Sequence, residues 1–378
     1  MKTVALVYFN AGGGHRAAAQ ALQSVIAEQG RPWHVQLVNL FEVLDPQGLF
    51  RKLTGLAPED YYNKRLARGW TLGLSQELVL LQGLIRFGHG AMLRRLQPFW
   101  QALAPDLVVS LVPNFNRVLY ESLPGIPLVT VMTDIADLPP NFWIEPGQDQ
   151  HLVCGSAKAV EQARAAGYGD ERIHRSSGMI LRPDFYRAST LDRAALGLDP
   201  GRAAGIVLFG GQGSQVMQTI ARELHDTPLI LLCGHNQRLQ ARLRALPAAA
   251  PRVVVGHTSD VAGYMRLADF FIGKPGPGSV SEALHCGLPV IVTRNTWTMP
   301  QERYNTDWVR ENEVGLVLPN FRDIRAAVAA LLPRLDTLRT NVGRLHNRAV
   351  FEVPELLARL LAADRASQDC RITVTATS

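Results

Sequence analysis

The chain alternates short, continuous apolar runs with longer segments whose apolar residues recur at helical spacing. The runs at 4–9, 107–111 and 206–209 have the length of strands and are rich in Val, Leu and Ile. Continuous apolar strands separated by helices are typical of parallel sheets covered on both faces. The pattern therefore predicts an α/β fold. The candidate strands are 4–9, 35–40, 107–111, 128–132 and 152–154 in the first half, and 206–209, 229–233, 253–255, 270–272, 290–293 and 314–318 in the second.

This series of strands and helices occurs twice, which predicts two doubly wound domains with a cleft between them at the carboxyl ends of the strands. A polar stretch rich in Pro, Asp and Arg at 182–201 separates the two series. We therefore expect an N-terminal domain over 1–182 and a C-terminal domain over 183–366. The polar end of the chain, 367–378, is expected to be a flexible tail.

Composition narrows the class of protein. The chain has 378 residues, of which 47% are hydrophobic and 19% charged, so general disorder is excluded. Its four cysteines are scattered without a C-x-x-C pair, which indicates a reduced, intracellular protein rather than a zinc ribbon, an iron–sulfur protein or a disulfide scaffold. No apolar run approaches the ~20 residues of a membrane-spanning helix, and no signal peptide precedes the first strand.

Positive charge is concentrated in one stretch. The formal net charge is +6, and residues 51–100 hold eight Lys or Arg against three acidic residues. Leu, Ile and aromatic residues between 70 and 87 lie among these charges. Basic residues mixed with apolar ones suit an anionic lipid surface, although a core helix with a solvated basic face, or a dimer contact, explains the same pattern. Nucleic acid is not expected, because no recognition helix, zinc finger or aromatic RNA platform is present.

Each half opens with a strand, a glycine-rich loop and a helix. The loops are N-A-G-G-G-H-R at 10–16 and F-G-G-Q-G-S at 209–214. Glycine permits positive φ and the close approach of another group, and a helix N-terminus attracts anions, although tight strand–helix turns also use glycine. Neither loop has the G-x-G-x-x-G spacing of a dinucleotide site, and no P-loop motif is present.

A third loop, G-K-P-G-P-G-S-V-S-E at 273–282, joins a strand to a helix that is expected to begin near Ser279. The free N–H groups of such a helix can hold a diphosphate. Glu282 lies one turn further and can accept hydrogen bonds from a ribose diol. The alternative is that Glu282 is the capping-box partner of Ser279.

These motifs resemble the monogalactosyldiacylglycerol synthase and diacylglycerol glucosyltransferase family, to which the transferase that makes lipid II is more distantly related. The resemblance covers most of the chain in the correct order. Its motifs are G-G-G-H-R at 12–16, the segments 129–134 and 177–183, V-V-V-G-H at 253–257, M-R-L-A-D at 265–269, the third loop through 284, G-L-P at 287–289 and Q-E-R-Y-N at 301–305.

The resemblance implies a GT-B fold of two Rossmann-like domains, inversion at the anomeric carbon, and no metal or other cofactor. The C-terminal half would bind a UDP-sugar and the N-terminal half the acceptor, with residues 51–100 facing the membrane. Glu282 would contact the ribose, His257 would lie near the base, and Gln301 and Glu302 would contact the sugar hydroxyls. The glycines and the serine expected near the diphosphate are Gly14, Gly211, Gly213, Gly278 and Ser279.

An inverting transfer needs a base for the acceptor hydroxyl and cationic or N–H groups for the leaving diphosphate. His15, on the first glycine loop, is the first candidate base, with a packing or phosphate-binding role as the alternative. Asp134 is the second, either as a base or as a residue that orients His15, and a cap or turn is its alternative. Arg16 is a weaker candidate for the diphosphate charge.

The sequence also departs from the family pattern. No His lies between Asp134 and Trp143, His257 stands where relatives often have Phe, and Met299 precedes Pro300 in place of Pro-Gly. We therefore expect a UDP-sugar-dependent hexosyltransferase acting on a diacylglycerol-like lipid, peripheral on the inner face of the cytoplasmic membrane. The alternatives are a soluble transferase for a small acceptor, a non-hydrolysing UDP-sugar epimerase and a non-catalytic nucleotide-sugar-binding protein. The sugar, the acceptor and the oligomeric state stay open.

Overall fold

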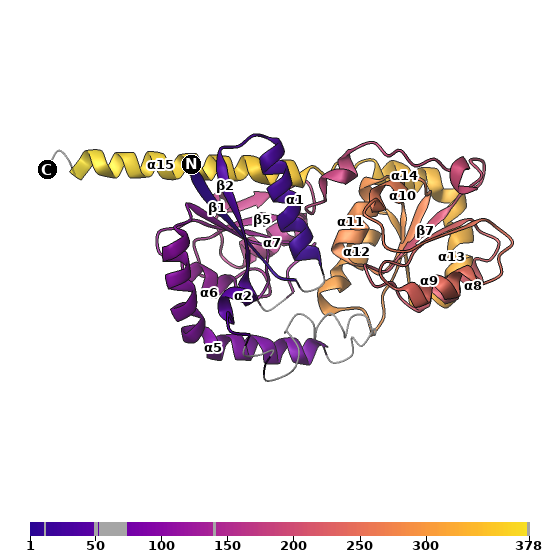
Figure 1. Ribbon diagram of the computed structural model, residues 1–378, viewed down its shortest axis with the longest axis horizontal. Helices are drawn as coiled ribbons and strands as arrows, with labels where there is room; N and C mark the ends of the chain where they lie inside the picture. Colours follow the sequence, from indigo (N-terminus) through magenta and orange to yellow (C-terminus); the bar gives the residue numbers. More distant parts are fainter. Residues whose placement is uncertain (11–12, 49–51, 53–73, 139–140, 376–378) are drawn as a thin grey trace. The chain divides into compact units, whose positions relative to one another are not determined.

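The computed structural model describes residues 1–10, 13–48, 52, 74–138 and 141–375, and for 74–79 and 364–375 only the backbone. The chain divides into two compact units. Among the described residues, the N-terminal unit contains 1–52, 80–183 and 348–375, and the C-terminal unit contains 74–79 and 184–347. Each unit is built on a six-stranded parallel sheet with helices packed against it (Figure 1).

The sheet of the N-terminal unit has the strand order β2-β1-β3-β4-β5-β6. The order reverses between β1 and β3, and ligands of open α/β sheets bind at such a point, beyond the carboxyl ends of the strands. The strands are β1 (Lys2–Tyr8), β2 (Trp33–Asn39), β3 (Leu107–Ser110), β4 (Leu128–Val131), β5 (His151–Cys154) and β6 (Ile173–Arg175). The helices are α1 (Gly14–Glu28), α2 (Leu40–Leu44), α5 (Leu74–Leu103), α6 (Asn116–Glu121), α7 (Ala157–Ala165) and α15 (Ala349–Thr375).

The sheet of the C-terminal unit has the order β12-β11-β10-β7-β8-β9, which reverses between β7 and β10. Its strands are β7 (Gly205–Leu208), β8 (Leu229–Leu232), β9 (Arg252–Val255), β10 (Phe270–Gly273), β11 (Val290–Thr293) and β12 (Gly315–Leu318). Its helices are α8 (Val216–Glu223), α9 (Gln237–Arg244), α10 (Val261–Arg266), α11 (Pro277–His285), α12 (Arg303–Glu311), α13 (Ile324–Leu331) and α14 (Leu335–Val342). Short 3-10 turns occupy Asp170–Arg172, Pro183–Tyr186, Ala194–Leu196, Pro300–Glu302, Phe321–Asp323 and Leu332–Arg334.

The α/β class and the two parallel sheets confirm the fold predicted from the apolar pattern. Every predicted strand is present. Among the strands in the described part of the chain, the pattern missed β6, because its sequence Ile-His-Arg contains a single apolar residue at the edge of the sheet.

The end of the chain differs from the expectation. We expected residues up to 366 to complete the C-terminal domain, but α15 packs against α1 and residues from 348 onward belong to the N-terminal unit. Val350, Val353, Leu357 and Leu361 are buried at helical spacing and account for this packing. Residues 367–375, expected as a tail, continue the helix.

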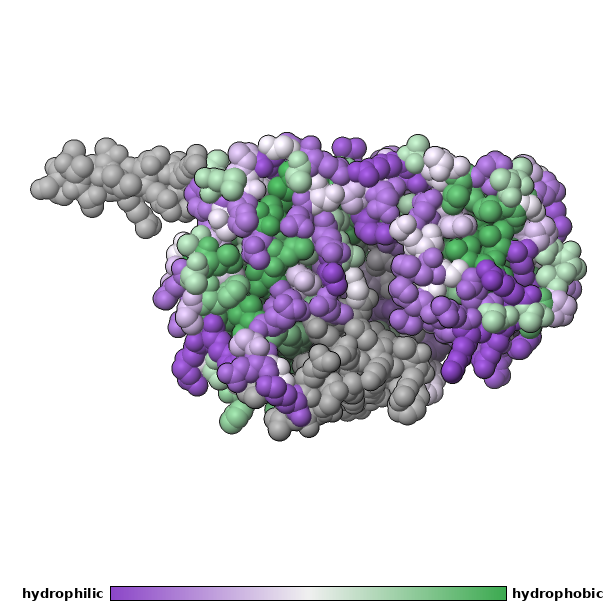
Figure 2. Space-filling model, viewed as in Figure 1, coloured by the Kyte–Doolittle hydropathy of each residue, from purple (hydrophilic) through white to green (hydrophobic). Residues whose placement is uncertain are grey.

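Helix α5 is buried near its end and exposes apolar side chains near its beginning. Near its end, Leu96 and Trp100 are buried, and the Trp100 indole donates a hydrogen bond of 2.9 Å to Ser122 Oγ. At its described beginning, Leu80, Leu84 and Phe87 are 65%, 59% and 94% exposed. Figure 2 shows apolar and hydrophilic residues side by side over this helix. No helix in the described part of the chain is long and apolar enough to cross a membrane.

Candidate active site

The first glycine loop places His15 at the reversal point of the N-terminal sheet. Gly13 precedes α1 at φ 78°, a conformation that favours glycine, and His15 follows on the first turn of the helix. Its Nδ1 lies 3.2 Å from the hydroxyl of Thr133, which follows β4. Gly12 lies outside the described residues, and the missing Cβ of Gly14 would point into open space.

The His15 ring lies between two aromatic side chains. Its centroid lies 6.0 Å from that of Trp143 and 6.3 Å from that of Phe9. Burial lowers the pKa of His15 to about 4, and a hydrogen bond with the Leu111 backbone only partly offsets this effect. The imidazole is therefore neutral near pH 7. A neutral ring that donates one N–H keeps its second nitrogen as an acceptor, which a general base requires.

Asp134 takes part in the same cluster through Trp143. Its buried carboxylate accepts a hydrogen bond of 2.9 Å from the Trp143 indole. The contact fixes the ring that lies beside His15, so Asp134 positions an aromatic wall of the site. Thr133 and Trp143 lie beside His15 in this candidate site, and the sequence motifs did not select them. The sequence feature that could have selected them is the Thr-Asp pair at 133–134 followed by a tryptophan.

Asp137, in the segment without the family's histidine, is a half-buried carboxylate with several hydrogen bonds. Asp137 Oδ1 accepts a hydrogen bond of 2.6 Å from the Trp143 backbone N–H, and Gln162 bonds to both backbone groups of Asp137. Burial raises the pKa of Asp137 to about 6. Asp137 is therefore tied to Trp143 on one side and to Gln162 of α7 on the other.

In the C-terminal unit the second glycine loop lies directly after β7. Gly210 and Gly213 have φ of 71° and 59°. A Cβ on Gly213 would lie 2.7 Å from Leu239, so packing also requires glycine there. Gly211 has open space at its Cβ position, and its carbonyl accepts a hydrogen bond of 2.8 Å from His235 N–H. A Cβ on Gly234 would lie 2.1 Å from the same carbonyl.

The third loop gives an uncapped helix N-terminus beside this glycine loop. Helix α11 begins at Pro277, two residues before the expected start, and its N-cap is Gly276. Ser279 therefore lies inside the first turn and is not the N-cap that the alternative, a capping box with Glu282, requires. Proline has no N–H, so Gly278 and Ser279 supply the first free N–H groups of the helix.

The Q-E-x-x-N motif lies against this loop. Glu302 is 6% exposed, and its Oε1 lies 3.0 Å from Lys274 Nζ. Asn305 is fully buried and donates a hydrogen bond of 2.7 Å to the Pro275 carbonyl. Gln301 Nε2 faces the Met299 sulfur at 3.9 Å.

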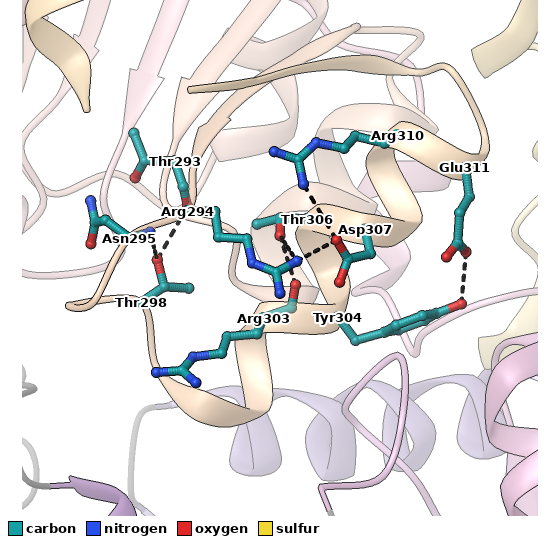
Figure 3. Close-up of polar contacts among 10 residues, drawn as sticks. All are labelled: Thr293, Arg294, Asn295, Thr298, Arg303, Tyr304, Thr306, Asp307, Arg310 and Glu311. Atoms are coloured by element: carbon teal, nitrogen blue, oxygen red, sulfur yellow. Dashed lines mark hydrogen bonds and ion pairs between the residues drawn. The ribbon is translucent and has the colours of Figure 1, made fainter. Parts of the chain in front are cut away.

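A second polar cluster holds the loop that carries Gln301 and Glu302 (Figure 3). Arg294, after β11, bonds to Asp307 on α12, and Asp307 also lies 3.3 Å from Arg310. Within the loop, Asn295 N–H donates a hydrogen bond of 3.0 Å to Thr298 Oγ1. These contacts fix both ends of the loop.

Two histidines form a stacked pair after neighbouring strands. His235 follows β8 and His257 follows β9, and their rings lie 4.0 Å apart at an interplanar angle of 19°. Both side chains are exposed. Only His257 was predicted, because His235 carries no motif signal and the pairing depends on strand adjacency.

Comparison with known proteins shows which proteins this chain is similar to. Residues 15–176 match the family model described as monogalactosyldiacylglycerol (MGDG) synthase. The N-terminal half of the chain is therefore similar to the MGDG synthases. It is 28% identical to the probable monogalactosyldiacylglycerol synthase 2 of Oryza sativa subsp. japonica, over 95% of this chain and 81% of that protein. It is 26% identical to monogalactosyldiacylglycerol synthase 1 of Arabidopsis thaliana, over 93% of this chain and 70% of that protein.

Solved structures confirm the GT-B fold predicted for this chain. Acinetobacter baumannii MurG matches with a TM-score of 0.57 and 14% identity, over 95% of this chain and all of that chain. The calicheamicin glycosyltransferase CalG4 matches with a TM-score of 0.61 and 17% identity, over 97% and 98% of the two chains. In the described residues no three His, Cys, Asp or Glu side chains are grouped to hold a metal ion.

Proposed function

We propose that the protein is an inverting glycosyltransferase that moves a hexose from a UDP-sugar to the hydroxyl of a diacylglycerol-like lipid. The neutral His15 carries the proposal, because an imidazole kept unprotonated beside aromatic rings suits a general base. The similarity to MGDG synthases over nearly the whole chain supports the acceptor class.

The C-terminal unit supplies the donor site in this proposal. The N–H groups of Gly278 and Ser279 and the open edge of Gly211 would receive the diphosphate. Glu282 would accept hydrogen bonds from the ribose, and the stacked ring of His257 offers a flat surface to the base. Gln301 and Glu302 would contact the sugar hydroxyls.

The N-terminal unit supplies the base. As the acceptor oxygen attacks the anomeric carbon, His15 takes the hydroxyl proton on its unprotonated ring nitrogen. The bond between that carbon and the diphosphate oxygen breaks, and the electron pair stays on the leaving UDP. Attack from the side opposite the leaving group inverts the configuration at the anomeric carbon. Asp134 has a positioning role, since it holds Trp143 beside the base.

Helix α5 would contact the membrane surface. Leu80, Leu84 and Phe87 recur at helical spacing and are exposed, and Arg86 and Arg94 lie on the same helix. Burial of such residues in the headgroup region adds to the attraction of basic side chains for anionic lipids. The remaining basic positions between 53 and 68 lie outside the described residues.

A label-transfer assay tests the proposal. Purified protein would be given UDP-glucose, UDP-galactose or UDP-N-acetylglucosamine with labelled sugar, together with dispersed diacylglycerol or a soluble-metabolite extract. We expect label in the organic phase from at least one donor. Label on a water-soluble product alone would reject the lipid acceptor and keep the transferase. Absence of binding to any UDP-sugar would reject the whole proposal.

A further inference from the structure

The ion pair between Lys274 and Glu302 has a role that the donor-site residues above leave unassigned. Glu302 is a buried carboxylate, and an unpaired charge in such a position is strongly unfavourable. The Lys274 side chain is 41% exposed, while that of Glu302 is 8% exposed. The ammonium therefore neutralises the carboxylate and remains open to solvent.

The position of Lys274 matters as much as its charge. It follows β10 at the reversal point of the sheet, and its Cε lies 3.3 Å from where a Cβ of Gly276 would be. Gly276 is the N-cap of α11, so the ammonium lies near the partially positive end of that helix. The ammonium of Lys274 and the partially positive helix end together favour an anion between or beside them, and Glu302 is that anion here.

Gly276 leaves room for this arrangement to change. Its missing Cβ would lie 3.3 to 3.5 Å from Lys274, Ser279 and Glu302, so any larger residue would fill the space between the three side chains. An anion entering at the helix N-terminus would meet the ammonium at this point. A diphosphate carries more charge than one carboxylate and competes effectively for the lysine.

We infer that Lys274 is a diphosphate-binding residue, and that the diphosphate of the donor replaces Glu302 as its partner. This inference rests on the proposed function and deepens it. The released Glu302 carboxylate then accepts hydrogen bonds from the sugar hydroxyls, so diphosphate and sugar recognition are coupled. When the bond from the anomeric carbon to the diphosphate breaks, Lys274 stays protonated and stabilises the charge left on UDP.

Comparison of UDP with UMP isolates the contact, because UMP lacks the second phosphate. By calorimetry, we expect Lys274→Met to weaken UDP binding roughly 10- to 100-fold and UMP binding much less, as for the loss of a charged hydrogen bond. Lys274→Arg should retain most of the UDP affinity. Equal losses for UDP and UMP, or no loss for UDP, would overturn the inference.

Glu302→Gln tests whether the diphosphate replaces Glu302 as the partner of Lys274, and here UDP affinity should not fall. The variant removes the carboxylate that competes for Lys274, so we expect UDP to bind the same or several-fold tighter while sugar transfer falls. A weaker affinity for UDP would show that Glu302 does not compete. Thermal unfolding of both variants, compared with the wild type, reports whether each is folded.

Arg325→Met is the matched control. Arg325 forms an exposed ion pair of 2.9 Å with Asp226 in the same unit, so this variant makes the same change in net charge away from the third loop. Its UDP affinity should equal that of the wild type. A loss as large as in Lys274→Met would show that net charge, and not a local contact of Lys274, determines UDP affinity, and would overturn the inference. If the wild type binds neither UDP nor UMP, the proposed function fails; if it binds UDP and Lys274→Met binds equally well, only the inference fails.

Discussion

The imidazole of His15 combines two properties that a general base needs. It is neutral, because burial among Phe9 and Trp143 disfavours the charged form. It is also oriented, because Nδ1 lies 3.2 Å from the Thr133 hydroxyl and the ring bonds to the Leu111 backbone. A histidine with an ordinary pKa would be partly protonated at slightly acidic pH, whereas this ring is not.

His15→Ala should leave UDP affinity unchanged and lower kcat roughly 10²- to 10⁴-fold, as for the loss of a general base. Because the base must be unprotonated and its pKa is about 4, the wild-type rate should be flat from pH 8 to about pH 5.5 and fall only below that. His34→Ala, at an exposed position of β2, is the control. Near-normal turnover of His15→Ala, or a wild-type inflection near pH 6.5, would contradict the assignment.

Sequence motifs predicted the candidate residues that lie within a single loop. His15 and Glu302 were predicted because each stands in a recognisable string of residues. The contacts of Thr133, Trp143 and His235 were not predictable in the same way. Each meets its partner through strands that are adjacent in a sheet and distant along the chain, and spacing in a single sequence carries no information about such pairs.

The loops of the C-terminal sheet support one another through glycine. The turn after β8 approaches the loop after β7 so closely that a Cβ on Gly234 would lie 2.1 Å from the Gly211 carbonyl. Gly234 also has a φ of 57°, which a side chain rarely adopts. The position of the glycine loop therefore depends on a residue that would not itself touch the donor.

Gly234→Ala should displace the glycine loop and weaken UDP binding by about 1–3 kcal/mol, with a similar loss of stability from backbone strain. Calorimetry and thermal unfolding check the two effects. Gly201→Ala, where a Cβ would meet only Asp199 at 3.4 Å, is the control and should change neither quantity appreciably. Unchanged UDP affinity of a folded Gly234→Ala would separate the glycine loop from the donor site.

Element boundaries show where apolar periodicity alone was insufficient. The strands were predicted well because a buried parallel strand is a continuous apolar run. The start of α11 was placed two residues late, because Pro277 at the first helical position was interpreted as part of the turn. Helix α15 was assigned to the wrong unit, because an amphipathic stripe shows that a helix is covered without showing what covers it.

Helix α5 gives a prediction about the membrane. Phe87 is 94% exposed, so Phe87→Glu should cost little stability while placing a negative charge on the apolar face. Sedimentation with vesicles that contain phosphatidylglycerol should show clearly reduced binding, with less effect on UDP affinity. Arg117→Glu is the control, since Arg117 is an exposed residue of α6 in the same unit. Equal vesicle binding of Phe87→Glu and the wild type would remove α5 from the membrane surface.

Buried ionisable groups are concentrated in the N-terminal unit and make its stability depend on pH. Between β5 and β6, His151 Nδ1 lies 2.9 Å from His174 Nε2, and Arg172 lies 2.8 Å from His151 Nε2. Arg172 can only donate, so His151 must accept at Nε2 and donate from Nδ1 to His174. Both rings are therefore neutral in this chain of hydrogen bonds.

Burial, with Arg172 and His174 as further causes, lowers the pKa of His151 to about 4, and the nearby Asp149 only partly opposes this. Burial also lowers the pKa of His174, with Arg359 and Arg172 adding to the effect. A histidine whose pKa falls on folding contributes its full stability above its unfolded pKa of about 6.5 and loses it as the pH falls toward 4. Asp137 acts in the opposite direction, since its raised pKa of about 6 favours the folded state on acidification.

His151→Gln should remove much of this pH dependence, because glutamine retains polar groups without a titrating ring. For the wild type, His151 alone predicts a loss of about 2 kcal/mol between pH 7.5 and pH 5, as a pKa of about 4 against 6.5 requires. Hydrogen exchange of the β5 and β6 amides at the two pH values measures the loss where it arises. His34→Gln, at an exposed position of the same unit, should keep the wild-type slope. Parallel slopes for His151→Gln and the wild type would mean that the neutral histidine pair is not the source of the acid sensitivity, and that His15, whose pKa is also lowered by burial, dominates it instead.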